Sequence, residues 1–298
     1  MNDTLYLRFS YPRKSGSHAV MNWVSDILGG DVCLFNNKMF RKLRGQPLGA
    51  KGLGLSRGDL GFPELYAPKR LAIPEGLQDR HVFLTFEDKV LEPVPKRACP
   101  ELDKPGFDIV ILRDVYNWLA SILIEKGRTR LIEHPDPSVK NRRMWYQYAT
   151  NIDWKNYVRL DHLVRCWTMH AEEALSPGTY LETPGFSILF NPWKVDKNYR
   201  QEICAKLGGS YAERTIKYIA SAHKMDGAFD TLEVYEGRGD KLPVLHRWEF
   251  FMNNPLYWEI LDKYPKLEEL SAKLFGEVIP EREKYPLGEL ARRFRDEP

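Results

Sequence analysis

A strand pattern that passes through a basic turn into a helix pattern, over residues 5–24, is the feature that most constrains how this chain can fold. Residues 5–10 (LYLRFS) alternate apolar and polar side chains, and Tyr11-Pro12 ends the pattern because proline lacks the N–H that a sheet ladder needs. Residues 19–23 then suit a helix. A strand, a turn and a helix in this order are the layout of a cradle for an anion.

The turn itself, residues 13–18 (RKSGSH), carries groups that bind anions. It holds two cations, two hydroxyls, one glycine and an imidazole immediately before the helix. The first N–H groups of a helix have no acceptor within it, and the helix N-terminus carries a partial positive charge. We therefore expect a phosphate or sulfate to bind the main chain, the hydroxyls and Lys14 together. An ordinary solvated helix cap would have a similar composition, so the interpretation needs a second match elsewhere in the chain.

The order of residues in this turn separates two kinds of phosphate loop. The nucleoside-triphosphatase pattern G-x-x-x-x-G-K-[ST] is not met, because the lysine precedes Gly16 and no earlier glycine has the required spacing. The turn instead resembles the 5′-phosphosulfate loop, commonly written YPKSGTTW, of sulfotransferases that use 3′-phosphoadenosine 5′-phosphosulfate (PAPS). Arg13 is an additional residue in that pattern, and His18 replaces its second threonine. The resemblance implies that the cofactor contacts Arg13, Lys14, Ser15, Gly16, Ser17 and His18.

A second strand-to-helix pattern strengthens this resemblance. Residues 108–112 (DIVIL) predict a buried strand, Arg113 stands at its end, and residues 114–122 continue as an apolar helix. In the family, an arginine and a serine in this layout bind the 3′-phosphate, which implies that role for Arg113 and Ser121. Arginine suits it because the guanidinium fork donates two parallel hydrogen bonds to phosphate oxygens.

Two further matches lie late in the chain. Family members often cover the 3′-phosphate with an Arg/Gly/Lys-rich loop, and residues 238–241 (RGDK) resemble it. Arg238 is therefore our candidate for a further phosphate contact. The pair Arg247-Trp248 loosely matches an Arg-Trp pair that bacterial members often carry before their final helices.

The candidate general base lies at the end of the strand predicted over residues 81–86 (HVFLTF). A parallel strand delivers its C-terminal residues to the ligand edge of the sheet. In the sulfotransferases that the chain resembles, the corresponding strand ends with the base, which is a histidine in many members and a glutamate in several that act on sugars. Glu87 is our first candidate, Asp88 the second and His18 the third. The alternative is that both carboxylates form a solvated strand end or a helix cap.

The chain as a whole predicts an α/β fold, a P-loop-like parallel sheet flanked by helices on both faces, formed by a single domain over residues 1–298. Helical spacing over residues 163–175 predicts that Trp167 and His170 are core or half-buried residues and not catalytic ones. A helix over about 196–207 is expected to end at Gly208-Gly209. Strands are predicted over residues 5–10, 81–86, 108–112 and 186–190, and loop or helical insertions near the acceptor site over residues 31–80 and 125–160.

Composition excludes some classes of protein. A formal net charge of +3 over 298 residues is too small to predict a general nucleic-acid binder. The apolar runs are far too short to span a bilayer, which predicts no membrane segment. The four cysteines have no metal-ligand spacing and, with no visible secretion signal, indicate a cytoplasmic protein with reduced thiols.

The resemblance implies a PAPS-dependent sulfotransferase that transfers a sulfonate group to a hydroxyl or amine of a small-molecule or carbohydrate acceptor. The product would be adenosine 3′,5′-bisphosphate, no metal would be required, and Lys14, Glu87 and His18 would be catalytic. Two alternatives stay open, a kinase-like phosphoryl transferase and a non-catalytic nucleotide-binding member of the same fold. A polynucleotide-binding module, suggested by the cations and aromatic residues after Glu125, ranks third.

Overall fold

Five parallel strands form the sheet of this protein, in the order β2-β3-β1-β4-β5. The computed structural model describes residues 5–29, 32–35, 81–88, 90–91, 106–133, 160–181, 185–211, 244–252, 254–276 and 279. The strands are β1 (Tyr6–Tyr11), β2 (Val32–Phe35), β3 (His81–Glu87), β4 (Gly106–Leu112) and β5 (Gly185–Leu189).

The four strands predicted from the sequence are confirmed, and with the helices they establish an α/β fold. Strand β2 was not predicted, because residues 31–80 were expected to be an irregular connection. Its four residues, VCLF, pair in parallel with β3 at one edge of the sheet. So short a strand carries too little alternation to be distinguished from a loop by pattern alone.

The helices follow the strands along the chain, and two of them were predicted closely. The helix predicted over 163–175 begins at Leu160, and Trp167 and His170 are both buried in it as expected. The helix predicted over 196–207 is capped by the Asp196 side chain and ends at Gly208, which has a left-handed backbone with φ +66°. The helical segments are α1 (Ser17–Ile27), α3 (Val115–Glu133), α5 (Leu160–Leu175), α6 (Phe190–Val195), α7 (Lys197–Leu207), the 3₁₀ helix η3 (Arg247–Phe251), α9 (Pro255–Lys263) and α10 (Pro265–Phe275).

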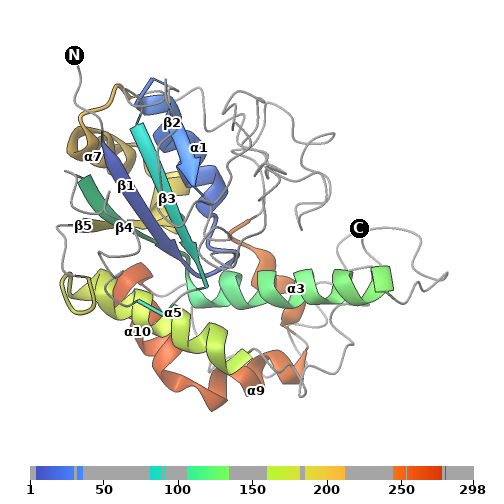
Figure 1. The fold of residues 1–298 in the computed structure, drawn as a ribbon. Helices are drawn as coiled ribbons and strands as arrows, with labels where there is room; N and C mark the ends of the chain where they lie inside the picture. The colour runs from blue at the N-terminus through green and yellow to red at the C-terminus, as the bar shows by residue number, and fades with distance from the viewer. Residues whose placement is uncertain are drawn as a thin grey trace, which may run out of the picture.

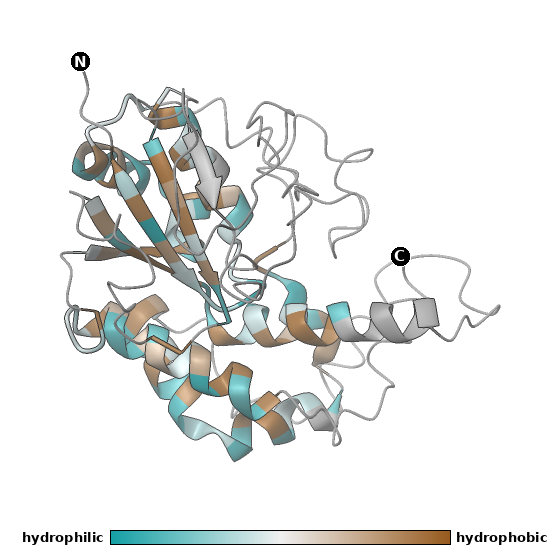
Figure 2. Ribbon diagram, viewed as in Figure 1, coloured by the Kyte–Doolittle hydropathy of each residue, from teal (hydrophilic) through white to brown (hydrophobic). Residues whose placement is uncertain are grey.

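Two hydrophobic clusters lie on the two faces of the sheet. Leu7, Phe9 and Tyr11 of β1 pack with buried residues of α1 and α7. Because side chains alternate along a strand, Arg8 and Ser10 point to the opposite face, on which α5 lies. A second cluster joins α3, α5, α9 and α10, which Figure 1 shows gathered together. Figure 2 shows hydrophobic residues concentrated in the strands and mixed with hydrophilic ones along the helices.

The carboxyl ends of the strands meet at the start of α3. In Figure 1 the arrowheads of β1 and β3 point to that end of the helix. In the register of the sheet, Tyr11 at the end of β1 stands opposite Glu87 at the end of β3. Open α/β sheets bind their ligands at this edge. Among the described residues, no helix is long and apolar enough to cross a membrane.

Candidate anion-binding site

The loop between β1 and α1 is a tight turn built around two left-handed residues. Lys14 has φ +64° and Gly16 has φ +80°. The N–H and the hydroxyl of Ser15 both donate to the carbonyl of Pro12, at 3.3 and 2.6 Å. Ser15 is buried, so its two donors close the turn instead of facing a ligand. Gly16 is the N-cap of α1 and contributes no side chain that could accept from the first N–H groups of the helix.

Gly16 is also a point of close approach. A Cβ atom at this position would lie 2.2 Å from two ring carbons of Phe190, the first residue of α6. The same ring lies 5.4 Å from the guanidinium carbon of Arg113. Phe190 therefore contacts both sequence motifs, the basic loop and the strand-end arginine.

Two neighbouring elements hold the loop in place. The Arg13 N–H donates to Asp88 Oδ1 at 2.8 Å, and the Arg13 guanidinium forms an ion pair with Asp88 Oδ2. On the other side, Trp118 of α3 donates its indole N–H to the Arg13 carbonyl at 2.9 Å. Both carboxylate oxygens of Asp88 are thus bonded to Arg13, which makes Asp88 an anchor of the loop.

Glu87 lies next to this anchor at the end of β3. Burial raises the pKa of Glu87 to about 7, and the charge of Asp88 acts in the same direction, whereas Arg13 and Lys14 oppose the rise. Burial also raises the pKa of Tyr11, and the charge of Glu87 adds to the effect. A carboxyl group with this pKa is ionised about half of the time at neutral pH, as a general base requires.

The remaining loop residues lie where the sequence placed them. Ser17 is buried in the first turn of α1, and its hydroxyl is hydrogen-bonded to that of Tyr11. His18 is the second residue of the helix and is half-buried. The Lys14 ammonium lies 3.5 Å from Oε1 of Glu125 in α3. Glu125 therefore faces the loop, a contact that was not among the sequence predictions.

A second group of polar side chains surrounds the hydroxyl of Ser121. This hydroxyl donates to the Asn117 carbonyl at 2.6 Å and accepts from Arg113 Nη1 at 2.9 Å. It also accepts from Arg247 Nη1 at 3.0 Å. Ser121 therefore uses its proton within α3 and orients two arginines, instead of pointing a donor outward. The expected approach of Arg113 and Ser121 is present in the structure, and Arg247 joins them from η3.

The two arginines have the same charge, and Arg113 is buried whereas Arg247 is partly exposed. Burial lowers the pKa of Arg113 to about 9, and the charge of Arg247 lowers it further, while Asp114 opposes the change. Arg113 is 2% exposed, and its Nε and Nη2 have no hydrogen-bond partner among the described residues. Buried donors without acceptors are rare in native proteins and indicate an unfilled role. A phosphate would supply both the acceptors and the opposite charge.

Three side chains support the two arginines. The carboxylate of Asp114 accepts from the Asn117 N–H at 2.9 Å, which caps the start of α3. It also accepts from the side-chain amide of Asn191 at 2.9 Å, which ties α6 to α3. Asn117 in turn accepts from the Arg247 N–H at 2.8 Å. Asn191 lies in the first turn of α6, and through Asp114 it holds the turn at the end of β4.

Arg238, the other predicted phosphate contact, lies outside the described residues, as do most of residues 31–80 and 134–159 of the expected insertions. The sequence indicated Arg247 only through a loose match, and it did not predict Glu125 or Phe190 as site residues. The four-residue spacing from Asn117 to Ser121 to Glu125 was the available signal for Glu125, since it places all three on one face of α3.

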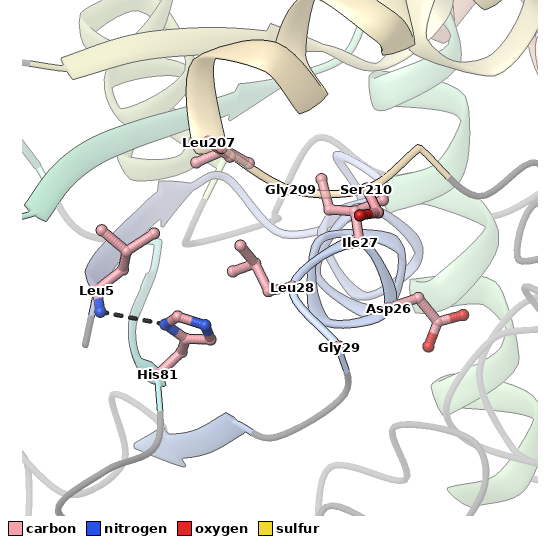
Figure 3. A pocket seen from close by; sticks show the side chains of 10 residues that line it. Leu5, Asp26, Ile27, Leu28, Gly29, His81, Leu207, Gly209 and Ser210 are labelled. Carbon is pink, nitrogen blue, oxygen red and sulfur yellow. Dashed lines mark hydrogen bonds between the residues drawn. The ribbon is translucent and has the colours of Figure 1, made fainter. Parts of the chain in front are cut away.

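A cavity of about 380 Å³ lies at the opposite edge of the sheet, next to the first residues of β1 and β3. His81 Nδ1 there accepts from the Leu5 N–H at 3.1 Å (Figure 3). None of the predicted site residues lines this cavity, so the candidate site is assigned to the carboxyl edge. The lining residues are Leu5, Asp26, Ile27, Leu28, Gly29, His81, Leu207, Gly208, Gly209 and Ser210.

Comparison with protein-family models finds no family that matches this chain, and comparison with curated protein sequences finds no match. The geometry of the site is therefore the basis for a functional proposal.

Proposed function

We propose that this protein is a PAPS-dependent sulfotransferase with a P-loop-like fold. The observation that carries the proposal is the convergence of Arg113 and Arg247 on the Ser121 hydroxyl, beside the basic loop of β1 and α1. Arg113 Nε and Nη2 have no hydrogen-bond acceptor among the described residues, and an anion bound there would supply acceptors and the opposite charge. A phosphate group suits the two arginines because each guanidinium can donate two parallel hydrogen bonds to it.

The relation between the two motifs supports a ligand with two anionic groups. Strands β1 and β4 are neighbours in the sheet, so the turns that follow them lie at the same edge. The ring of Phe190 contacts both Gly16 and Arg113. A molecule with one charged group at the basic loop and a second at Arg113 and Arg247 has the layout of PAPS, with its 5′-phosphosulfate and 3′-phosphate.

The residues of the loop would act on the leaving group. When bound, PAPS would supply an activated sulfonate group for transfer to the acceptor. Lys14 and the N–H groups at the start of α1 would bind the 5′-phosphate and stabilise the negative charge that grows on it. Ser17 and His18, in the same helical turn, would add to this stabilisation.

Glu87 would accept the proton of the attacking acceptor group. Its raised pKa fits this role, since a base with a pKa near 7 combines ionisation with sufficient basicity, and such proton transfer contributes about 10²- to 10⁴-fold to the rate. Asp88 is bonded to Arg13 through both of its oxygens and is less suited to the role. We propose a hydroxyl or amine of a small-molecule or carbohydrate compound as the acceptor.

The decisive experiment measures the affinity of the purified protein for adenosine 3′,5′-bisphosphate by calorimetry, with 5′-AMP and ATP as controls. We expect the bisphosphate to bind at least tenfold more tightly than 5′-AMP. Replacing Arg113 by alanine should weaken its binding by about 10- to 100-fold, the range for losing a hydrogen bond to a charged group. Arg165→Ala, which removes an exposed cation of α5, is the matched control and should leave the affinity unchanged.

Three results would overturn the proposal. If the bisphosphate binds no better than 5′-AMP, the arginines do not form a 3′-phosphate site. If ATP with Mg²⁺ binds more tightly than the bisphosphate and its γ-phosphate is transferred, the protein is better interpreted as a kinase-like phosphoryl transferase. Tight bisphosphate binding without sulfonate transfer to a broad acceptor panel would favour a non-catalytic member of the fold.

A further inference from the structure

Glu125 places a negative charge beside the two cations of the basic loop. It lies one helical turn after Ser121, on the same face of α3. Its Oε1 lies 3.5 Å from Lys14 Nζ, and its Oε2 lies 3.9 Å from Arg13 Nη1. These side chains are 16–26% exposed, so their interactions are screened less than those of surface pairs.

The two carboxylates that contact the loop have different geometries. Asp88 accepts from the backbone N–H of Arg13 as well as from its guanidinium, and so fixes the shape of the turn. Glu125 contacts the loop through the ends of side chains, and its pair with Lys14 involves the ammonium group that an anion at the loop would need. An anion bound to Lys14 would approach the Glu125 carboxylate, and two negative charges within a few ångström repel each other.

We propose that Glu125 is a positioning residue that competes with the bound anion for Lys14. In the ligand-free protein it holds the ammonium group beside the loop and balances the charges of Lys14 and Arg13. When the anion binds, Lys14 transfers to it, and the repulsion from Glu125 promotes release of the anionic product. The identity of that anion rests on the proposed function, whereas the competition applies to any oxyanion at the loop.

The effect of Glu125 on neighbouring ionisable groups supports this role. Its charge contributes to the raised pKa of Glu87 and to the raised pKa of Arg13, so it acts on the groups at the carboxyl edge of the sheet. We therefore expect removal of the charge to change the affinity for an anion at the loop as well as the packing of α3.

The test compares wild-type protein with Glu125→Gln, using adenosine 3′,5′-bisphosphate and inorganic sulfate as probes. Calorimetry gives the affinities and stopped-flow gives the dissociation rate of the bisphosphate. We expect Glu125→Gln to bind both probes about 5- to 20-fold more tightly, mainly through slower dissociation. Glu269→Gln removes the same charge from an exposed pair with Lys273 in α10 and should change neither affinity.

A double-mutant cycle separates competition from a direct effect of charge. In a Lys14→Ala background, Glu125→Gln should increase the sulfate affinity by less than half the factor seen with Lys14 present. An equal factor in both backgrounds would overturn the proposal, because Glu125 would then act without Lys14.

A merely structural role makes the opposite prediction. If Glu125 only braces the loop, Glu125→Gln and Glu125→Ala should bind the probes with unchanged or lower affinity, or fail to fold by circular dichroism. Any of these results in both variants would overturn the competition.

The two probes distinguish failure of this inference from failure of the proposed function. Wild-type protein that binds sulfate but does not prefer the bisphosphate to 5′-AMP would contradict the proposed function, and the sulfate affinities would still decide the role of Glu125. Binding of neither probe by the wild type and the variants would overturn both.

Discussion

At Glu87, burial and the charge of a neighbouring carboxylate both raise the pKa of the side chain. Transfer from water to a partly enclosed strand end disfavours the ionised carboxyl group, and the charge of Asp88 disfavours it further. Arg13 and Lys14 limit the rise of the pKa to a value of about 7. The surroundings therefore leave Glu87 able to gain or lose a proton near neutral pH.

The first prediction concerns the pH dependence of transfer. Because only ionised Glu87 can accept a proton, kcat/KM for an acceptor should rise with pH and level off above about 7. Glu87→Gln should lower kcat by about 10²- to 10⁴-fold and remove this rise. The bisphosphate affinity of the variant should stay within a factor of three. A rise that persists in Glu87→Gln would assign the base to another residue, with His18 the next candidate.

The pKa of Arg113 is shifted as well, but the side chain stays charged at neutral pH although its surroundings disfavour the charged form. Burial and the charge of Arg247 lower its pKa, yet the value of about 9 leaves it protonated at neutral pH. Two of its nitrogens lack acceptors among the described residues. We infer that this buried cation lowers the stability of the ligand-free protein, and that a bound phosphate would offset the loss.

The second prediction follows from that loss. Arg113→Met keeps much of the side-chain volume and removes buried donors that lack acceptors, so it should raise the free energy of unfolding of the ligand-free protein by about 1–3 kcal/mol. It should also weaken bisphosphate binding by about 10- to 100-fold, as is expected of Arg113→Ala. Urea denaturation with and without the bisphosphate measures both effects.

Arg200 provides the matched control. It is also buried, but its guanidinium donates to the carbonyl of Trp193 at 2.9 Å, so Arg200→Met should destabilise the protein. A similar destabilisation by Arg113→Met would mean that Arg113 is satisfied without a ligand.

At the scale of elements, α3 connects the two parts of the site. Asn117, Ser121 and Glu125 follow one another at intervals of four residues and lie on one face of the helix. Asn117 and Ser121 hold Arg247, whereas Glu125 faces the basic loop. Trp118 of the same helix is bonded to the loop backbone, so the helix sets the position of the loop relative to the arginines.

The third prediction concerns the closest approach between two elements, where Gly16 meets Phe190. Gly16→Ala should destabilise the protein for two reasons, the left-handed backbone and the contact of the new Cβ with the ring. The first effect alone costs about 1–2 kcal/mol. Bisphosphate binding should also weaken, because the loop has to move.

Gly208→Ala is the control for the backbone effect, since Gly208 is left-handed as well but has no atom within 4 Å of a new Cβ. We expect it to be less destabilising than Gly16→Ala and to leave bisphosphate binding unchanged. Adding Phe190→Ala to Gly16→Ala should restore part of the affinity. Equal losses of stability in the two glycine variants would show that the ring yields to the new methyl group.

At the scale of the whole molecule, α5 covers one face of the sheet and buries His170 completely. Nδ1 of His170 lies 2.6 Å from the Cys166 carbonyl, as for a hydrogen bond donated within the helix. Burial lowers the pKa of His170 to about 4, with the hydrogen bond to Cys166 opposing the change. The folded protein thus keeps this histidine neutral at pH values at which the unfolded chain protonates it.

The fourth prediction is a loss of global stability in acid that depends on His170. The folded pKa is lower than the unfolded value of 6.5, so this stabilisation is complete above pH 6.5 and decreases as the pH falls toward 4. The loss should approach roughly 3 kcal/mol, and His170→Gln, which does not titrate, should lack it.

The measurement is urea denaturation of both proteins between pH 7 and pH 4.5. The raised pKa of Glu87 has the opposite effect on stability over an overlapping pH range, so the difference between the two proteins is the relevant quantity. Parallel pH curves would contradict the prediction, because they would show that His170 has the same pKa in the folded and the unfolded protein.

The sequence by itself predicted the features that depend on neighbouring residues. Alternating side chains predicted the strands β1, β3, β4 and β5, and helical spacing predicted that Trp167 and His170 of α5 are buried. The order of residues after β1 and β4 predicted a turn with basic groups before α1 and the approach of Arg113 to Ser121. These features were accessible because periodicity and turn chemistry act over a few residues.

Only the tertiary structure decided the order β2-β3-β1-β4-β5 and the partners of each charge. Arg247 reaches Ser121 across 126 residues of chain, and Glu125 reaches Lys14 from a helix that follows a different strand. Asp88 is an anchor of the loop because parallel pairing brings the ends of β1 and β3 together. Such contacts depend on how strands pair and helices pack on them, and the local pattern of a sequence carries no information on which distant side chains then meet.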